Sequence, residues 1–299
     1  MAAASLSDIL ATHEAERLAT GFVFTEGPLW HPDGHWFFVD IRQNRLYRLI
    51  PGRDAEVVRE TAGGNGTTFD LQGRLVLCEG GARRVVRIGA NGQVETVADR
   101  YKGGRFNRPN DVVCRSDGSL YFTDPDKRVP YAEREIPGPA GVNNLWDGAC
   151  VYRVMPDGDV SVTAYCEYPN GLALSPDERT LYVANTRSTK YIHAIELDAS
   201  GKRSGRRIFA DMNEGKEPGI PDGLKVDSEG NVYCTGPGGI WVFNPAGKRI
   251  GVIRFPEQAV NFAFGGPDLK TLFCCAHTSV YTLKVKVPGN PHPWYRLRR

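Results

Sequence analysis

The sequence lacks the features that mark several large classes of protein. It has no apolar run long enough to cross a membrane, and no basic N-terminal segment followed by an apolar one, as in a signal peptide. It also has no stripe of like charge, because its 37 basic and 35 acidic residues are spread along the chain and give a net charge of +2. We therefore expect a cytoplasmic protein with no nucleic-acid and no membrane partner.

Cysteine is sparse and shows no metal-binding or disulfide spacing. The seven cysteines include no CxxC pair and stand mostly within apolar stretches. We expect buried reduced thiols, because a disulfide framework would be denser and the ligands of a zinc knuckle would be paired. Two catalytic motifs are also missing: there is no GxSxG of a serine hydrolase, and GGNGTT lacks the lysine of a phosphate-binding loop.

The sequence is rich in turn formers and short alternating strands. Among its 34 glycines and 20 prolines, one unit recurs: a short apolar alternation, a polar turn and a second strand rich in Tyr, Phe, Val and Leu. Six units follow one another at intervals of roughly 40 to 60 residues, the range of propeller blades. They are GPLWHPDGHWFFVDI, GTTFDLQGRLVLCE, DVVCRSDGSLYFTDP, GLALSPDERTLYVANT, GLKVDSEGNVYCTG and FAFGGPDLKTLFCCA.

The repeat predicts an all-β fold, a six-bladed β-propeller with four-stranded blades around a central axis. Further strand-like segments such as NRLYRLI follow each unit, which gives four strands per blade. A single unit cannot bury both faces of its sheet, whereas stacking in a ring can. We expect one domain over residues 1–299, with residues 17–24 closing the ring against the last blade. A pair of open β-sandwich sheets is the alternative, and it leaves the repeat unexplained.

Two segments do not repeat. We expect residues 1–14 to be an N-terminal extension with a frayed helix. Residues 125–148 form a long insertion within the third blade, and their four prolines and three glycines argue against regular structure. A loop of this length in a compact domain is typical of a lid or a binding loop, and a tolerated surface insertion is the alternative.

An oxygen-bearing side chain stands directly before each first strand. These residues are Glu26, Asn65, Asn110, Asn170, Asp222 and Asn261. Because the innermost strands of a propeller line its channel, we expect the six side chains to converge on the axis at one end. Asn and Asp also favour turns through their own hydrogen bonds, which accounts for Asn65 and Asn261 but not for Glu26.

A bound cation would hold such a ring together. Glu26 and Asp222 repel each other near the axis, and none of the six positions is a Lys, Arg or His that could neutralise them. Two carboxylates with amide oxygens suit a hard cation. We therefore expect one divalent metal ion, with Ca²⁺ favoured and Zn²⁺, Mg²⁺, Mn²⁺ or Fe²⁺ as alternatives. An open coordination position would admit water or a substrate carbonyl.

Four stretches are specific in combination: TEGPLW with VDI, NRPNDVV with SDGSLYFTDP, YPNGLALSPDERTLYVAN and PDGLKVDSEGNVYCTGPGGIWVFNPAGKRIG. On these, the sequence resembles the senescence-marker-protein/gluconolactonase family from about Leu18 to VYTLKVKVPG. The resemblance implies a six-bladed propeller with one axial divalent metal, held by Glu26 of EGP, Asn170 of PNG and Asp222 of PDG. It also implies that Asn110 of RPND lies beside the metal and that Arg108 contacts substrate, and it gives Asn65 and Asn261 a lesser part.

Two departures from the family pattern bear on function. Asn185, in YVANT, stands where many relatives carry Asp, so a charge near the site would be missing. The insertion cannot be aligned with the family, so its residues are candidates for substrate contact only. Those candidates are Tyr131, Glu133, Glu135, Asn144 and Trp146.

These observations predict a metal-dependent hydrolase of carbohydrate metabolism, a gluconolactonase-like lactonase that opens an aldonolactone to the sugar acid. The metal would polarise the lactone carbonyl, Asp222 would be ligand and catalytic base for the attacking water, and Arg108 and Asn110 would orient the substrate. The alternatives are a phosphotriesterase of the diisopropylfluorophosphatase type and a non-catalytic propeller with a structural cation. We expect a small-molecule sugar lactone as partner, and a monomer or a small homo-oligomer.

Overall fold

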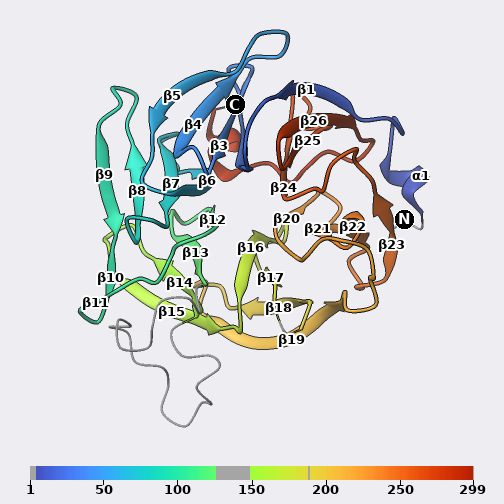
Figure 1. The fold of residues 1–299 in the computed structure, drawn as a ribbon. Helices are drawn as coiled ribbons and strands as arrows, with labels where there is room; N and C mark the ends of the chain where they lie inside the picture. Colours follow the sequence, from blue (N-terminus) through green and yellow to red (C-terminus); the bar gives the residue numbers. More distant parts are fainter. Residues whose placement is uncertain (1–4, 126–148, 188, 299) are drawn as a thin grey trace.

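The protein is a ring of six four-stranded antiparallel sheets, arranged as the blades of a propeller (Figure 1). The computed structural model describes residues 5–125, 149–187 and 189–298. The all-β, six-bladed propeller predicted from the repeat is confirmed. The insertion predicted as a lid lies outside the described residues except for its first residue, Pro125.

Each of the first three blades is a meander in which the strands pair in chain order. Blade one contains β2 (Thr25–His31), β3 (His35–Asp40), β4 (Arg45–Leu49) and β5 (Glu56–Glu60). Blade two contains β6 (Gly64–Phe69), β7 (Leu75–Glu79), β8 (Arg84–Ile88) and β9 (Val94–Ala98). Blade three contains β12 (Val112–Cys114), β13 (Leu120–Asp124), β14 (Cys150–Val154) and β15 (Val160–Tyr165). The hairpin before blade three contains β10 (Arg100–Tyr101) and β11 (Gly104–Arg105).

The next two blades follow the same order, and the sixth takes its outer strand from the other end of the ring. Blade four contains β16 (Pro169–Leu174), β17 (Thr180–Asn185), β18 (Tyr191–Leu197) and β19 (Arg203–Asp211). Blade five contains β20 (Leu224–Val226), β21 (Val232–Gly236), β22 (Gly239–Phe243) and β23 (Arg249–Ile253). Blade six contains β24 (Asn261–Gly265), β25 (Thr271–Ala276), β26 (Ser279–Lys284) and β1 (Glu16–Thr20).

The N-terminal strand closes the ring, as the sequence predicted. β1 pairs antiparallel with β26, so that Glu16 lies opposite Thr282 and Thr20 opposite Ser279. The helix expected before it is the single turn α1 (Leu6–Ile9). No helix in the described part of the chain combines the length and apolarity that a membrane crossing would need.

The core lies between the blades, because both faces of each sheet pack on neighbouring sheets. All five residues of β7, β13 and β21 are buried, which is why these strands read as nearly continuous apolar runs rather than clean alternations. Trp36 of blade one stacks on Phe273 of blade six with ring centroids 4.5 Å apart. The first strands of neighbouring blades contact one another around the axis, so they are the innermost strands of the ring (Figure 1).

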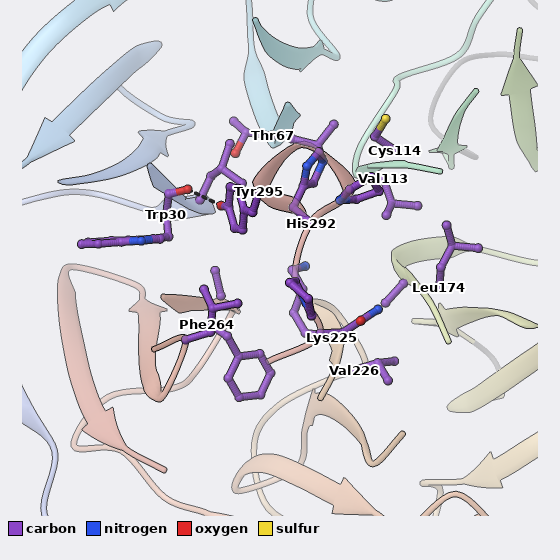
Figure 2. A pocket seen from close by; sticks show the side chains of 18 of the residues that line it. Trp30, Thr67, Val113, Cys114, Leu174, Lys225, Val226, Phe264, His292 and Tyr295 are labelled. Atoms are coloured by element: carbon purple, nitrogen blue, oxygen red, sulfur yellow. Dashed lines mark hydrogen bonds between the residues drawn. The ribbon is translucent and has the colours of Figure 1, made fainter. Parts of the chain in front are cut away.

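The C-terminal segment covers the channel where the inner strands end. Its helix α2 (Pro293–Leu297) places Tyr295 so that the phenol donates to the carbonyl of Trp30. His292 lies half-buried beside it, with Nε2 3.2 Å from Thr68 Oγ1. Both side chains face a cavity of about 130 Å³ in the channel (Figure 2). The residues at the starts of the inner strands therefore face the opposite end of the axis.

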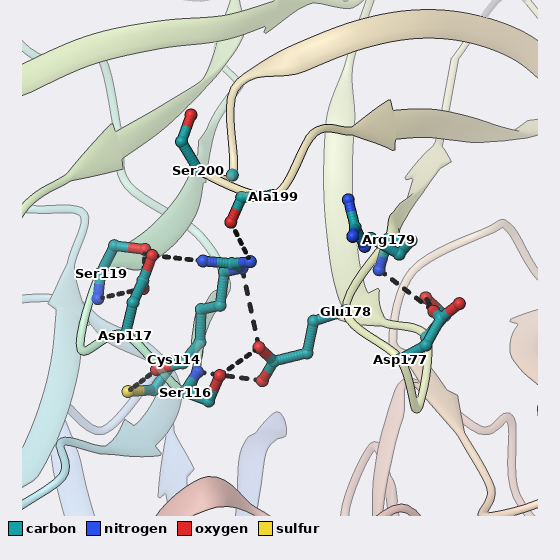
Figure 3. Close-up of polar contacts among 12 residues, drawn as sticks. Cys114, Ser116, Asp117, Ser119, Asp177, Glu178, Arg179, Ala199 and Ser200 are labelled. Carbon is teal, nitrogen blue, oxygen red and sulfur yellow. Dashed lines mark hydrogen bonds and ion pairs between the residues drawn. The ribbon is translucent and has the colours of Figure 1, made fainter.

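A polar cluster at the covered end ties blades three and four together (Figure 3). Arg115 donates to the carbonyl of Ala199 at 3.1 Å, and its Nε lies 3.6 Å from Glu178 Oε2. The backbone N–H of Ser116 donates to the same carboxylate at 2.9 Å. Since these groups bind one another across three turns, we assign the cluster a structural role.

Candidate active site

The polar residues at the starts of the inner strands line one cavity of about 460 Å³ at the end of the axis opposite the C-terminal segment. Five of the six members of the predicted ring line it: Glu26, Asn65, Asn110, Asn170 and Asp222. The sixth, Asn261, reaches the site through Glu26, because its Nδ2 donates to Glu26 Oε2 at 2.8 Å. The predicted substrate residue Arg108 also lines the cavity. The insertion candidates Tyr131, Glu133, Glu135, Asn144 and Trp146 lie outside the described residues.

Glycine next to the axial residues lets the inner strands approach closely enough to form this ring. A Cβ on Gly171 would lie 2.1 Å from the carbonyl oxygen of Asp222, and one on Gly27 would lie 2.1 Å from that of Asn65. In place of a side chain, the N–H of Gly171 donates to the carbonyl of Asp222 at 3.0 Å. The backbones of adjacent blades therefore meet directly, and the preceding side chains are drawn toward the axis.

Polar residues at the ends of second strands fix the loops around the cavity. Asp124, at the end of β13, accepts the N–H groups of Asn107 at 2.8 Å and Arg108 at 2.6 Å. Asp40, at the end of β3, accepts the N–H of Arg42 at 3.1 Å. These carboxylates occupy equivalent places in their blades and position the loop backbone rather than facing the axis.

Asn185, at the end of β17, takes the equivalent place in blade four with an amide. Its Oδ1 accepts the N–H of Tyr168 at 2.8 Å, as the carboxylates do for their loops. Its Nδ2 donates to the carbonyls of Thr189 at 2.6 Å and Arg187 at 3.0 Å, which a carboxylate could not do. An asparagine instead of an aspartate therefore suits this loop, because the loop presents the carbonyl oxygens of Arg187 and Thr189 to the side chain of Asn185.

The two axial carboxyl groups, of buried Glu26 and half-buried Asp222, both have raised pKa values. Glu26 is only 2% exposed. Its pKa is raised to about 7, chiefly by burial and next by the charge of Asp111. Burial and then the charges of Glu26 and Asp111 raise the pKa of Asp222 well above its usual range. A carboxylate in this state is stabilised by a nearby positive charge.

The hydrogen bonds leave particular oxygens of these side chains directed to the cavity. Glu26 Oε2 accepts both the N–H of Gly27 at 2.6 Å and the amide of Asn261, whereas Oε1 has no hydrogen bond within the described residues. Asn170 Nδ2 donates to Thr186 Oγ1 at 3.0 Å, and that hydroxyl in turn donates to the carbonyl of Pro221 at 2.7 Å. The hydroxyl therefore accepts the hydrogen bond from Asn170, so the Asn170 atom that faces it is the amide nitrogen. The amide oxygen, Oδ1, is then available to the cavity.

The charges around the axis leave a deficit of positive charge. Three carboxylates, those of Glu26, Asp111 and Asp222, influence one another there, and one ammonium faces them. Lys225 Nζ lies 3.6 Å from Asp111 Oδ2 and 3.4 Å from Asn261 Oδ1. With all three acids ionised, the net charge of these groups is about −2, which a divalent cation would balance.

The donor set fits a hard cation. Asn65 Oδ1 and Asp111 Oδ2 are buried oxygens without a hydrogen bond in the described structure. No group of three His, Cys, Asp or Glu side chains in the described residues is placed to hold one metal ion, and the other donors that line the cavity with Glu26 and Asp222 include the amides of Asn65, Asn110 and Asn170. Carboxylate and amide oxygens are the ligands of Ca²⁺ and Mg²⁺ rather than of Zn²⁺ in its usual protein sites.

The sequence analysis missed several residues of this site. Asp111 stands where four of the six blades carry glycine after the axial residue, and Lys225 interrupts the apolar pattern of GLKV. Both irregularities are visible in the aligned repeats and could have been noticed. Arg42 and Arg187 also line the cavity, but they lie in loops that carry no repeat signal.

Known proteins resemble the chain over most of its length. The family model described as SMP-30/Gluconolactonase/LRE-like region matches residues 24–278. A gluconolactonase of Zymomonas mobilis is 31% identical over 92% of this chain and 82% of its own length. A pentonolactonase of Haloferax volcanii is 31% identical over 83% of this chain and 79% of its own. The solved structure of a gluconolactonase from Xanthomonas campestris superposes with a TM-score of 0.82 and 32% identity, covering 94% of this chain and 92% of that one. The chain therefore belongs to the SMP-30/gluconolactonase family, as its motifs predicted.

Proposed function

We propose that the protein is a lactonase that hydrolyses a sugar lactone, an aldonolactone, to the open sugar acid. We further propose that it uses one divalent metal ion, with Ca²⁺ favoured, held by Glu26, Asn170 and Asp222. The lactonases among its relatives support the reaction class. The observation that carries the metal is the surplus of carboxylates over ammonium groups at the axis, where Glu26 and Asp111 are buried and Lys225 faces them.

When bound, the cation would supply a Lewis acid that polarises the lactone carbonyl. Asp222 would accept a proton from the attacking water on an oxygen not used for binding the cation. As water adds to the carbonyl carbon, the acyl bond to the ring oxygen breaks, and the proton that Asp222 accepted from the water would pass to the ring oxygen, which leaves as a hydroxyl group. Arg108 and Asn110, both on the cavity wall, would orient the substrate through fixed donors.

Metal removal tests this proposal. Chelator-treated protein should lose hydrolysis of glucono-1,5-lactone, followed by proton release in a pH-stat, and regain it with added calcium. Asp222→Asn should fail to bind calcium in a calorimetric titration that saturates the unaltered protein. The matched control is Asp211→Asn, the same exchange at an exposed residue outside the cavity, which should leave both readouts unchanged. Full activity in the chelated protein and in Asp222→Asn would refute the metal mechanism.

The open cavity favours catalysis over the scaffold alternative. A purely structural cation would be enclosed by protein oxygens, whereas Glu26, Asn170 and Asp222 line a space of about 460 Å³. The phosphotriesterase alternative uses the same polarising chemistry on a phosphoryl oxygen. A side-by-side assay with an organophosphate separates the two, and we expect hydrolysis of the lactone.

The cysteines support a cytoplasmic location and take no part in our mechanism. All seven are buried, and none forms a disulfide bond within the described structure. Burial raises the pKa of the Cys114 thiol to about 12, so this thiol stays protonated and unreactive at neutral pH. A set of free thiols is typical of a reducing compartment.

A further inference from the structure

Three arginines stand at the cavity on loops of similar construction. Arg42, Arg108 and Arg187 line it. Each loop backbone is tied to a strand-end residue: Arg42 through its N–H to Asp40, Arg108 through its N–H to Asp124, and Arg187 through its carbonyl to Asn185. The loops thus present three guanidinium groups from a fixed backbone, while the side chains themselves are exposed.

The guanidinium of Arg187 is further held by an aromatic ring. Its Cζ lies 4.5 Å from the ring centroid of Tyr168, which also lines the cavity. Within the described residues, neither Arg187 nor Arg42 has a carboxylate partner. A stacked guanidinium keeps its N–H edge free for a second, planar acceptor such as a carboxylate or phosphate.

These arginines leave the cavity positively charged once the axial carboxylates are neutralised. A divalent cation together with Lys225 would offset the carboxylates of Glu26, Asp111 and Asp222. In the part of the chain that the structure describes, Arg42 and Arg187 then remain without a counter-charge. A neutral lactone offers them hydroxyl groups only, whereas an anionic substituent offers charge-assisted hydrogen bonds, which are shorter and stronger.

We propose that the substrate is a lactone carrying an anionic group, a carboxylate or a phosphate, away from the lactone carbonyl, and that Arg187 binds this group. Arg42, on blade one across the ring from blade four, adds to the positive field that attracts it. This inference rests on the lactonase function proposed above. It assigns Arg187 and Arg42 to specificity, which is separate from the metal and from the hydrolysis itself.

Three lactones with carbon chains of one length test the inference: a neutral aldonolactone, an aldarolactone with a terminal carboxylate, and an aldonolactone with a terminal phosphate. We expect kcat/KM to be about 10- to 100-fold higher for at least one anionic lactone than for the neutral one, the range of a charged hydrogen bond. The preference should fall as salt is added. Which anionic lactone is preferred distinguishes a carboxylate from a phosphate ligand.

Variants locate the effect. Arg187→Gln should raise KM for the preferred anionic lactone about tenfold or more and leave the neutral lactone nearly unchanged, with a smaller loss in Arg42→Gln. The matched control is Arg207→Gln, because Arg207 is also exposed over an aromatic ring, 5.6 Å from that of Phe209, but lies outside the cavity. Arg207→Gln should leave the kinetics with the anionic and the neutral lactone unchanged.

The outcomes separate this inference from the function on which it rests. Hydrolysis of the neutral lactone with no preference for either anion, or equal losses on both substrates in Arg187→Gln, overturns the inference and leaves the lactonase in place. Hydrolysis of none of the three overturns the proposed function. In that case calorimetric titration with the open diacid and the phosphorylated acid still decides the anion site, since failure of both to bind overturns it.

Discussion

In the metal-free protein, the buried carboxyl of Glu26 should make folding stability fall as the pH rises. Its pKa of about 7 stands against an ordinary value of 4.5. That difference corresponds to about 3 kcal/mol between the two protonation states. We expect the replacement Glu26→Gln, which removes the ionisable group and keeps the shape, to recover most of this free energy at pH 8.

The sign follows from the direction of the shift. A group whose folded-state pKa is raised contributes stability that is fully present below its unfolded pKa and is lost as the pH rises through the folded pKa. For Glu26 the loss runs from about pH 4.5 to 7, and Asp222, also raised, acts in the same direction. Calcium should reverse the trend, because ionised carboxylates bind it better, so its added stability grows with pH.

Urea denaturation of chelator-treated protein at pH 5, 6, 7 and 8 measures this effect. Glu26→Gln should be close to the unaltered protein at pH 5 and more stable by about 3 kcal/mol at pH 8. Glu257 gives a control of opposite sign: burial raises its pKa, but hydrogen bonds to its carboxylate from Ser279, Thr278 and Tyr281 outweigh burial and lower it. Its contribution is lost as the pH falls, so Glu257→Gln should cost most at neutral pH. A constant difference between Glu26→Gln and the unaltered protein across the range would refute the reasoning.

Two further predictions concern the supports of the site. Asn261→Leu removes a hydrogen bond to Glu26, and Thr186→Val removes the acceptor that orients Asn170, so each should weaken calcium binding about tenfold by calorimetry. Thr186→Ser keeps the acceptor and should restore affinity, and unchanged binding in both deletions would argue against these roles. Tyr295→Phe removes the bond from the C-terminal helix to an inner strand and should lower stability by about 1 kcal/mol in urea, without affecting calcium binding.

The fold was predictable because it repeats. Six copies of one strand-turn-strand unit specify one register. In that register, Glu26, Asn170 and Asp222 stand at equivalent positions of the sequence. The closing strand was also predictable, since an incomplete last blade needs a fourth strand. The structure brings these three side chains to one cavity, and their part as metal ligands stays a prediction.

Features that differ from blade to blade could not be predicted from the repeat. Asp111 and Lys225 come together only because the inner strands of blades three and five, on either side of blade four, both line the channel, a proximity that no spacing along the chain encodes. Arg42 and Arg187 lie in loops whose sequences differ from blade to blade. The docking of Tyr295 was missed because one helical turn is too short to show an amphipathic period.

The pairing of β1 with β26 also has a consequence for how the chain is made. Blades one to five can each form as soon as their fourth strand leaves the ribosome, but β1, synthesised first, has no partner until β26 appears. Until then Leu18 and the free edge of this strand stay uncovered, which is a template for wrong pairing. A change in β1 should therefore act mainly on the yield of closed rings and less on the chemistry of those that close.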